Sequence, residues 1–152
     1  MASEVEVLNV AAQWVAYRRL TCDRDKIGPA ITAPDVLPGI YELAKKHGVQ
    51  AGPPYARYLR WGETDCDLQC GVPLTGPVPP EDNIVVDYYT SCRLAMLTFV
   101  GPYSELGKAH DTVIEFIKAN GYSFGGPCWE VYDGPGNPDG TATTHVCYAI
   151  EP

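Results

Sequence analysis

The sequence lacks the features that send a chain into or across a membrane. Its first residues contain no basic segment followed by an apolar run, so we expect no signal peptide. No apolar stretch approaches the roughly 20 residues needed to span a bilayer. We therefore expect a soluble, cytoplasmic protein with no membrane partner.

Basic residues are scarce as well. The chain has 11 Lys and Arg against 19 Asp and Glu, which gives a net charge of −8. Because phosphate backbones reward clustered Lys and Arg, this balance argues against nucleic acid as a partner. The same acidity favours cationic ligands, although only through the long-range field of the protein.

Patterns for metal binding and serine chemistry are also missing. Six cysteines without an export signal favour free thiols over a disulfide framework. The one close pair, Cys66 and Cys70, has no second pair and no nearby His in sequence, so we predict no zinc site and no cofactor. A G-x-S-x-G motif is absent. We interpret His47, His110 and His145 as structural or surface residues.

Aromatic residues are plentiful: the chain has ten Tyr, three Trp and three Phe. Tyr and Trp often line pockets because each joins an apolar ring to a polar group. One carboxylate, Glu130, lies among such rings in the run 126–132, which we predict to be a strand. Alternation puts Cys128, Glu130 and Tyr132 on one face. A desolvated Glu130 would bind a cation or accept a proton, whereas the alternative is an edge strand with Glu130 in water.

The remaining pattern predicts an α+β chain. We expect strands within 5–20, 55–61, 67–74, 91–100, 126–132 and 143–151, and helices over 27–47 and 105–120. The first helix is expected to be irregular before Gly39, because Pro34 and Pro38 interrupt its start. Gly48 and Gly121 stand where the helices should stop. Residues 75–83 are rich in Pro and form the loop between two halves.

The two halves repeat one another. Each is expected to contain a strand, a helix and two strands, and residues 52–58 align with 126–132 because Gly126 follows Gly52 by 74 positions. Such duplication predicts one antiparallel sheet with two helices on one face and a ligand cleft on the other. We therefore expect a single domain over 1–152 with pseudo-repeats at about 5–75 and 88–152. Ala56 stands where the second copy has Glu130, so the framework does not require the carboxylate.

A series of short motifs, in this order, resembles the gyrase-inhibitor-like (GyrI-like) small-molecule-binding domain, which is also the effector-binding domain of multidrug-sensing transcription activators. The motifs are Ile27-Gly28-Pro29-Ala30-Ile31, Gly52-Pro53-Pro54, Gly71-Val72-Pro73-Leu74, Gly101-Pro102-Tyr103 and Gly126-Pro127 with Glu130 and Tyr132. The resemblance implies a cleft between the halves, with Glu130 at the position of a buried glutamate that faces lipophilic cations. Phe99 departs from the pattern, because many members have a His there.

The first function that this implies is the binding of hydrophobic, aromatic or cationic small molecules, with Glu130 as counter-ion and aromatic rings as walls. The candidates for the walls are Tyr58, Trp61, Phe99, Tyr132, Tyr17 and Tyr148. We expect a monomer or a homodimer.

Two alternatives remain open. Some stand-alone members of the family are cyclopropanoid hydrolases, which open the cyclopropane ring of DNA-alkylating natural products. Here Glu130 would be the general base and Tyr103 would polarise the leaving oxygen. The other alternative is a regulatory protein that acts on gyrase or on a partner regulator.

Overall fold

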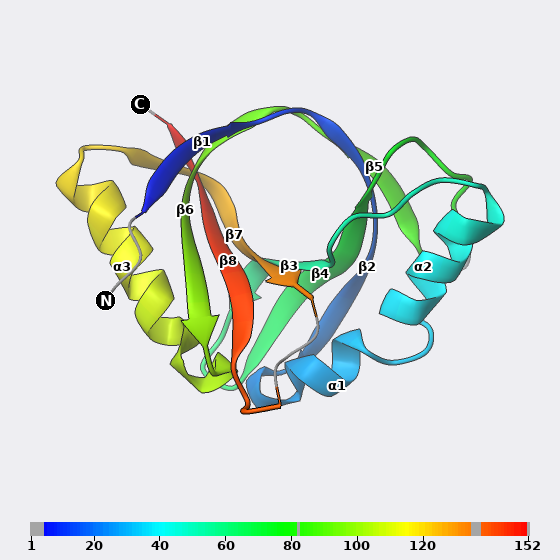
Figure 1. The fold of residues 1–152 in the computed structure, drawn as a ribbon, viewed down its shortest axis with the longest axis horizontal. Coiled ribbons are helices and arrows are strands. Elements are labelled where there is room, and N and C mark those ends of the chain that lie inside the picture. Colours follow the sequence, from blue (N-terminus) through cyan, green and yellow to red (C-terminus); the bar gives the residue numbers. More distant parts are fainter. Residues whose placement is uncertain (1–4, 82, 135–137, 152) are drawn as a thin grey trace. The chain divides into compact units, whose positions relative to one another are not determined.

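The computed structural model describes residues 5–81, 83–134 and 138–151 (Figure 1). The chain divides into two compact units. The N-terminal unit is Ala12–Thr90, and the C-terminal unit comprises the described residues of Met1–Ala11 and Ser91–Pro152. Each unit combines helices with an antiparallel sheet, so the α+β class and the duplicated strand-helix-strand-strand order predicted from the sequence are confirmed.

The N-terminal unit packs one helix on a four-stranded sheet. Its elements are β2 (Gln13–Asp23), α1 (Ile27–Ile31), α2 (Leu37–Lys46), β3 (Tyr55–Trp61), β4 (Asp65–Leu74) and β5 (Val85–Tyr89). The strand order is β3-β4-β2-β5, with every pairing antiparallel. Ile40 and Leu43 of α2 pack with Ala16 and Val72 in a dry core. Apolar burial of this kind, at about 25 cal/mol per Å², is what holds the helix on the sheet.

The C-terminal unit has the same plan. It contains β1 (Glu6–Val10), β6 (Cys92–Gly101), α3 (Leu106–Ala119), β7 (Ser123–Asp133) and β8 (Ala142–Glu151), in the sheet order β1-β6-β8-β7. Ala109, Val113 and Ile117 form the apolar stripe that the sequence predicted, and they pack against Leu97 of β6 and Val146 of β8. In Figure 1 α3 runs alongside β6 and β8.

Both main helices end in the same way. Gly48 follows α2 with φ 69° and Gly121 follows α3 with φ 72°. The next residue closes the turn in each case, since Val49 N–H donates to the Ala44 carbonyl at 3.0 Å and Tyr122 N–H donates to Ile117 at 3.1 Å. Glycine is favoured here because a left-handed residue with a Cβ is strained. The predicted stops are confirmed.

Three details differ from the sequence prediction or extend it. The single strand expected within 5–20 is wrong: β1 pairs with β6, whereas β2 pairs with β4 and β5, so the run is two strands in different units. The first helix is broken into α1 and α2, and Pro38 lies in the first turn of α2, where its missing N–H costs no hydrogen bond. Strand β5 was not predicted.

Thiols and helix lengths complete the description. The six cysteines, all of them among the described residues, form no disulfide with one another. Among the described helices, none is both long enough and apolar enough to cross a bilayer.

Candidate functional site

Glu130 is a buried carboxylate in the middle of β7. The residue is only 6% exposed. Glu130 lies opposite Val146 in the β7–β8 ladder, and Val146 packs under α3, so Glu130 is on the face that α3 covers. The sequence prediction placed the cleft on the face opposite the helices. Because a buried carboxylate is costly unless it is paired, the partners of Glu130 define what the site can do.

His110 and Tyr132 hydrogen-bond to this carboxylate, and Tyr148 hydrogen-bonds to His110. His110 Nε2 of α3 lies 2.7 Å from Glu130 Oε2. The Tyr132 hydroxyl donates to Glu130 Oε1 at 2.8 Å, and the Tyr148 hydroxyl of β8 lies 2.8 Å from His110 Nδ1. These four residues, called the Glu130 cluster below, form one connected chain from Tyr148 through His110 and Glu130 to Tyr132.

The surroundings of His110 raise its pKa, which favours the protonated imidazole at neutral pH. Burial by itself lowers the pKa of His110, but the neighbouring Cys128 and Glu130 outweigh it and raise the pKa to about 9. A protonated imidazole donates from both nitrogens, so Nε2 donates to Glu130 and Nδ1 to the Tyr148 hydroxyl. Burial raises the pKa of Tyr148, which keeps its hydroxyl neutral. The cluster is thus an imidazolium–carboxylate pair flanked by two phenols.

Two more of the predicted residues lie beside this cluster in the same unit. Tyr103, just before α3, is 52% exposed, and its ring centre lies 6.2 Å from that of Tyr132 in an edge-to-face contact. Tyr103, Tyr132 and Glu130 therefore form a line from solvent to the buried carboxylate. Phe99 of β6 packs against the core under α3.

The other predicted wall residues belong to the N-terminal unit. Tyr17 and Tyr58 are each 9% exposed. Trp61 is 53% exposed and stacks edge-to-face on Tyr58 at 5.3 Å, with the Arg24 guanidinium 4.4 Å from its ring centre. That these rings share a cleft with Glu130 stays a prediction.

His110 is the residue that the sequence interpretation missed. It was interpreted as structural or surface, like the other histidines, whereas it contacts Glu130 directly. One sequence signal does point to it: His110 stands four residues after Leu106 and three before Val113, on the apolar stripe of α3. A titratable side chain on a buried helix face needs a polar partner, and Glu130 is the buried acid available to it.

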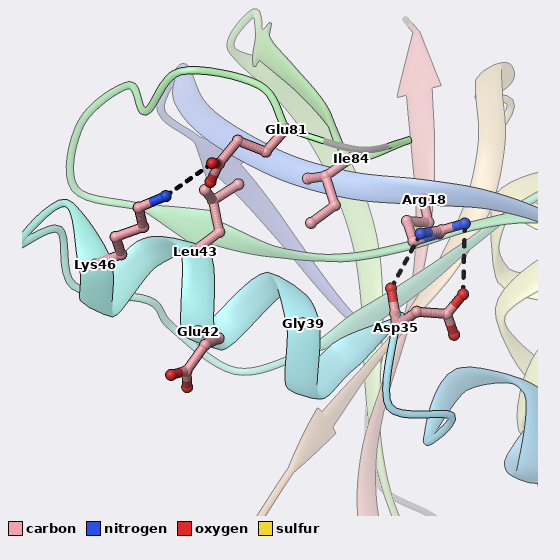
Figure 2. Close-up of a pocket in the computed structure, with 8 residues that line it drawn as sticks. All are labelled: Arg18, Asp35, Gly39, Glu42, Leu43, Lys46, Glu81 and Ile84. Atoms are coloured by element: carbon pink, nitrogen blue, oxygen red, sulfur yellow. Dashed lines mark hydrogen bonds and ion pairs between the residues drawn. The ribbon is translucent and has the colours of Figure 1, made fainter.

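An open pocket in the N-terminal unit is a weaker candidate. It lies over α2, with Leu43 and Ile84 on its floor (Figure 2). Its two cations already contact carboxylates: Arg18 lies 3.6 Å from Asp35, and Lys46 lies 2.8 Å from Glu81. Because each cation is already paired with a carboxylate of the same pocket, neither provides a strong charge for orienting a ligand. Within the ranges that the structure covers, no three His, Cys, Asp or Glu side chains gather closely enough to hold a metal ion.

Solved structures with this fold include a protein in complex with DNA, a hydrolase and a protein bound to tetraphenylphosphonium. The EcmrR C-terminal domain is 17% identical with a TM-score of 0.85, and 99% of each chain is covered. In the EcmrR–DNA complex the present chain spans 58% of the length of EcmrR. A hydrolase from Listeria innocua is 13% identical, with a TM-score of 0.72 and coverage of 99% of this chain and 93% of that one. SAV2435 bound to tetraphenylphosphonium is 10% identical, with a TM-score of 0.61 and coverage of 97% and 95%.

At the sequence level no curated protein matches the chain significantly. One family does match, over residues 3–151: the GyrI-like small molecule binding domain. This range covers all the strands and helices described above, so the resemblance seen in the motifs is confirmed. The chain belongs to the GyrI-like family of small-molecule-binding domains.

Proposed function

We propose that the protein binds a lipophilic aromatic cation, with the carboxylate of Glu130 as its counter-ion. The observation that carries this proposal is the burial of Glu130 with His110 Nε2 at 2.7 Å, a contact that raises the pKa of His110. The site already stabilises a positive charge next to the carboxylate. Rings of Tyr132 and Tyr103 lead from it toward solvent and provide faces on which a cation can stack.

Binding exchanges one cation for another. A ligand cation beside Glu130 takes the place of the imidazolium, and His110 then loses one of the two neighbours that raise its pKa, while Cys128 remains. Burial, which lowers the pKa of His110, favours release of the proton. Since the carboxylate keeps a single positive partner throughout, no uncompensated charge is buried at any stage.

A solved neighbour supports the choice of ligand class. SAV2435, which has this fold, was solved bound to tetraphenylphosphonium, a permanent cation with four aromatic rings. An ion of this kind has no hydrogen-bond donors, so its recognition depends on apolar contact and on charge alone. A buried carboxylate among tyrosine rings meets both requirements.

The test is a titration with tetraphenylphosphonium, followed by calorimetry, in the natural protein and in Glu130→Gln. We expect the substitution to weaken binding by at least about tenfold, which corresponds to roughly 1.4 kcal/mol. Glu115→Gln is the matched control, because Glu115 lies on the exposed side of α3 and its substitution should leave the affinity unchanged. Equal affinity in Glu130→Gln and the natural protein would rule out the counter-ion role.

A second function, hydrolysis of a strained ring, is favoured by the line from Tyr103 through Tyr132 to Glu130. At a pH above the pKa of His110, which is about 9, the imidazole is neutral, and Glu130 could then accept a proton from water while a tyrosine hydroxyl polarises the leaving oxygen. The neighbour from Listeria innocua is a hydrolase. Turnover of a cyclopropane-bearing alkylator that is lost in Glu130→Gln and reduced in Tyr103→Phe would support this function. Absence of turnover in the natural protein would reject it for that substrate class.

A further inference from the structure

Two arginines flank a glutamine on the sheet face of the N-terminal unit that α2 does not cover. Arg57 of β3 and Arg19 of β2 both pair with Gln69 of β4, one from each side. Residues paired across a ladder share a face, and adjacent strands lie about 4.8 Å apart, so the two arginines begin about 10 Å apart. The opposite face, with Ala16 and Val72, is the one that packs under α2.

A row of aromatic residues runs beside these arginines on the same face. Tyr55 and Tyr17 both pair with Gly71, and the Tyr89 ring of β5 lies 6.2 Å from Tyr55 and 6.4 Å from Tyr17. Gly71 cannot be replaced without a clash, because a Cβ there would lie 2.6 Å from that of Tyr17. Because Gly71 has no side chain, the rings of Tyr17 and Tyr55 can occupy the space between their two strands.

The recorded partners of Arg57 are neutral groups. Its Nη1 donates to Gln69 Oε1 at 3.2 Å, and its Cζ lies 4.9 Å from the centre of the Tyr89 ring. The Tyr89 hydroxyl donates to the same Gln69 oxygen at 2.8 Å, and the Tyr55 hydroxyl donates to that of Tyr89 at 3.2 Å. Burial raises the pKa of Tyr55 and of Tyr89, so both hydroxyls stay protonated as donors.

Arg60, on the same strand, differs from Arg57 in that it forms ion pairs. Arg60 lies 3.0 Å from Asp65 and 3.0 Å from Asp67, so two carboxylates satisfy its charge. In the parts of the chain that the structure covers, no carboxylate lies within 4.0 Å of the guanidinium of Arg57 or Arg19. Arg57 is half-buried and Arg19 is exposed, so one anion can reach both.

We propose that this face binds a planar aromatic molecule that carries a carboxylate, with the anion held by Arg57 and Arg19 and the ring against Tyr89, which is half-buried and contacts the buried rings of Tyr55 and Tyr17. A guanidinium has five N–H donors in a planar fork that matches a carboxylate, and the Gln69 oxygen uses one of those of Arg57. The net charge of −8 repels anions at long range, so these two local cations must supply the attraction. The ligand class is opposite in charge to that proposed for Glu130, and the site does not depend on Glu130.

The experiment compares 2-naphthoate with 2-naphthylmethanol, which has the same rings and no charge, by calorimetry on the full chain. We expect naphthoate to bind more tightly than the alcohol, and Arg57→Gln to weaken naphthoate at least about tenfold while leaving the alcohol unchanged. Arg60→Gln is the matched control, since the charge of Arg60 is satisfied by Asp65 and Asp67, and it should leave both affinities unchanged.

Further variants separate this site from the Glu130 cluster. Glu130→Gln should leave the affinity for naphthoate unchanged. If Arg57→Gln does not fold, as judged by its thermal unfolding, the exposed Arg19→Gln takes its place, with an expected loss of at least threefold. Equal binding of naphthoate and the alcohol, no naphthoate binding, or an unchanged affinity in the arginine variant would overturn the proposal.

Discussion

The two units build the same framework around opposite kinds of interior. Glu130 pairs with Val146 in one sheet as Ala56 pairs with Cys70 in the other, and this aligns the strands of the two units. Gly121 follows Gly48 by 73 positions, and this aligns their helices. The positions of Glu130, His110 and Tyr148 then correspond to those of Ala56, Leu37 and Val72. All three counterparts are apolar, and Ala56 and Val72 are fully buried.

At the next strand position, on the sheet faces that the helices do not cover, the N-terminal unit is the one with the charged residue. Arg57 in the N-terminal unit corresponds to Val131 in the C-terminal unit, 74 positions later. At these strand positions the C-terminal unit has Glu130 under α3, whereas the N-terminal unit has Arg57 on the face that α2 does not cover. Because a dry core suffices in the N-terminal unit, the Glu130 cluster is not needed for the fold. A buried charge that the framework does not need is a candidate for ligand binding, and this is the role proposed above for Glu130.

The largest effect should come from Ala56→Glu, which puts the carboxylate of the C-terminal unit at the counterpart position. Ala56 is 0% exposed, and Leu37 and Val72, at the positions of His110 and Tyr148, offer neither a cation nor a hydroxyl. Only Tyr58, at the position of Tyr132, could donate to the new carboxylate. We expect a loss of about 4 kcal/mol of unfolding free energy, or failure to fold. Urea unfolding at pH 7 measures this loss of free energy. Surface substitutions cost up to about 0.5 kcal/mol, and a loss no larger than that would contradict the comparison of the two units.

Substituting His110 and Glu130 by the apolar residues of the N-terminal unit should show that the two charges depend on one another. His110→Leu leaves Glu130 buried without its cation and should cost about 3 kcal/mol. Adding Glu130→Ala should recover most of that loss, since both positions then match the dry interior of the N-terminal unit. Urea unfolding of the two single variants and the double variant gives the coupling energy. Simple additivity of the two losses would mean that the pair does not act as a unit.

Stability should fall with rising pH because of His110. Its pKa is about 9 in the folded protein, against 6.5 for an ordinary histidine. A raised pKa means that the folded state holds the proton more tightly, so this contribution is complete below about pH 6.5 and is lost as pH rises through 9. We expect a decline on the order of 2 kcal/mol, measured by urea unfolding from pH 6 to pH 10. The profile of His110→Gln should be flatter by that amount.

The smallest effect is expected at the two helix ends, where the units have the same backbone geometry. Gly48→Ala and Gly121→Ala each put a Cβ on a left-handed residue at a helix end, with φ 69° and 72°. Each should cost about 1 kcal/mol, and the two costs should agree within about 0.5 kcal/mol. Thermal unfolding of both variants gives the values. A cost confined to one glycine would show that the two helix ends are not equivalent.

Much of the fold was predictable from local patterns. Strand β3 was predicted with the bounds that it has, because Gly and Pro delimit an aromatic run, and α3 followed from its apolar stripe. The split between β1 and β2 was not predictable, since only their distant partners separate them. Alternation put Tyr132 beside Glu130 correctly. His110 was missed because a helix-to-strand contact depends on how α3 packs, which local periodicity does not report.

The central claim is that a ligand cation replaces the imidazolium of His110 at Glu130. Calorimetry of tetraphenylphosphonium binding at pH 8, in buffers of different ionisation enthalpy, counts the protons released. We predict release of close to one proton per bound cation in the natural protein, because His110 with a pKa of about 9 is still mostly protonated at that pH. We predict close to none in His110→Gln. Binding with no proton release in the natural protein would contradict the account.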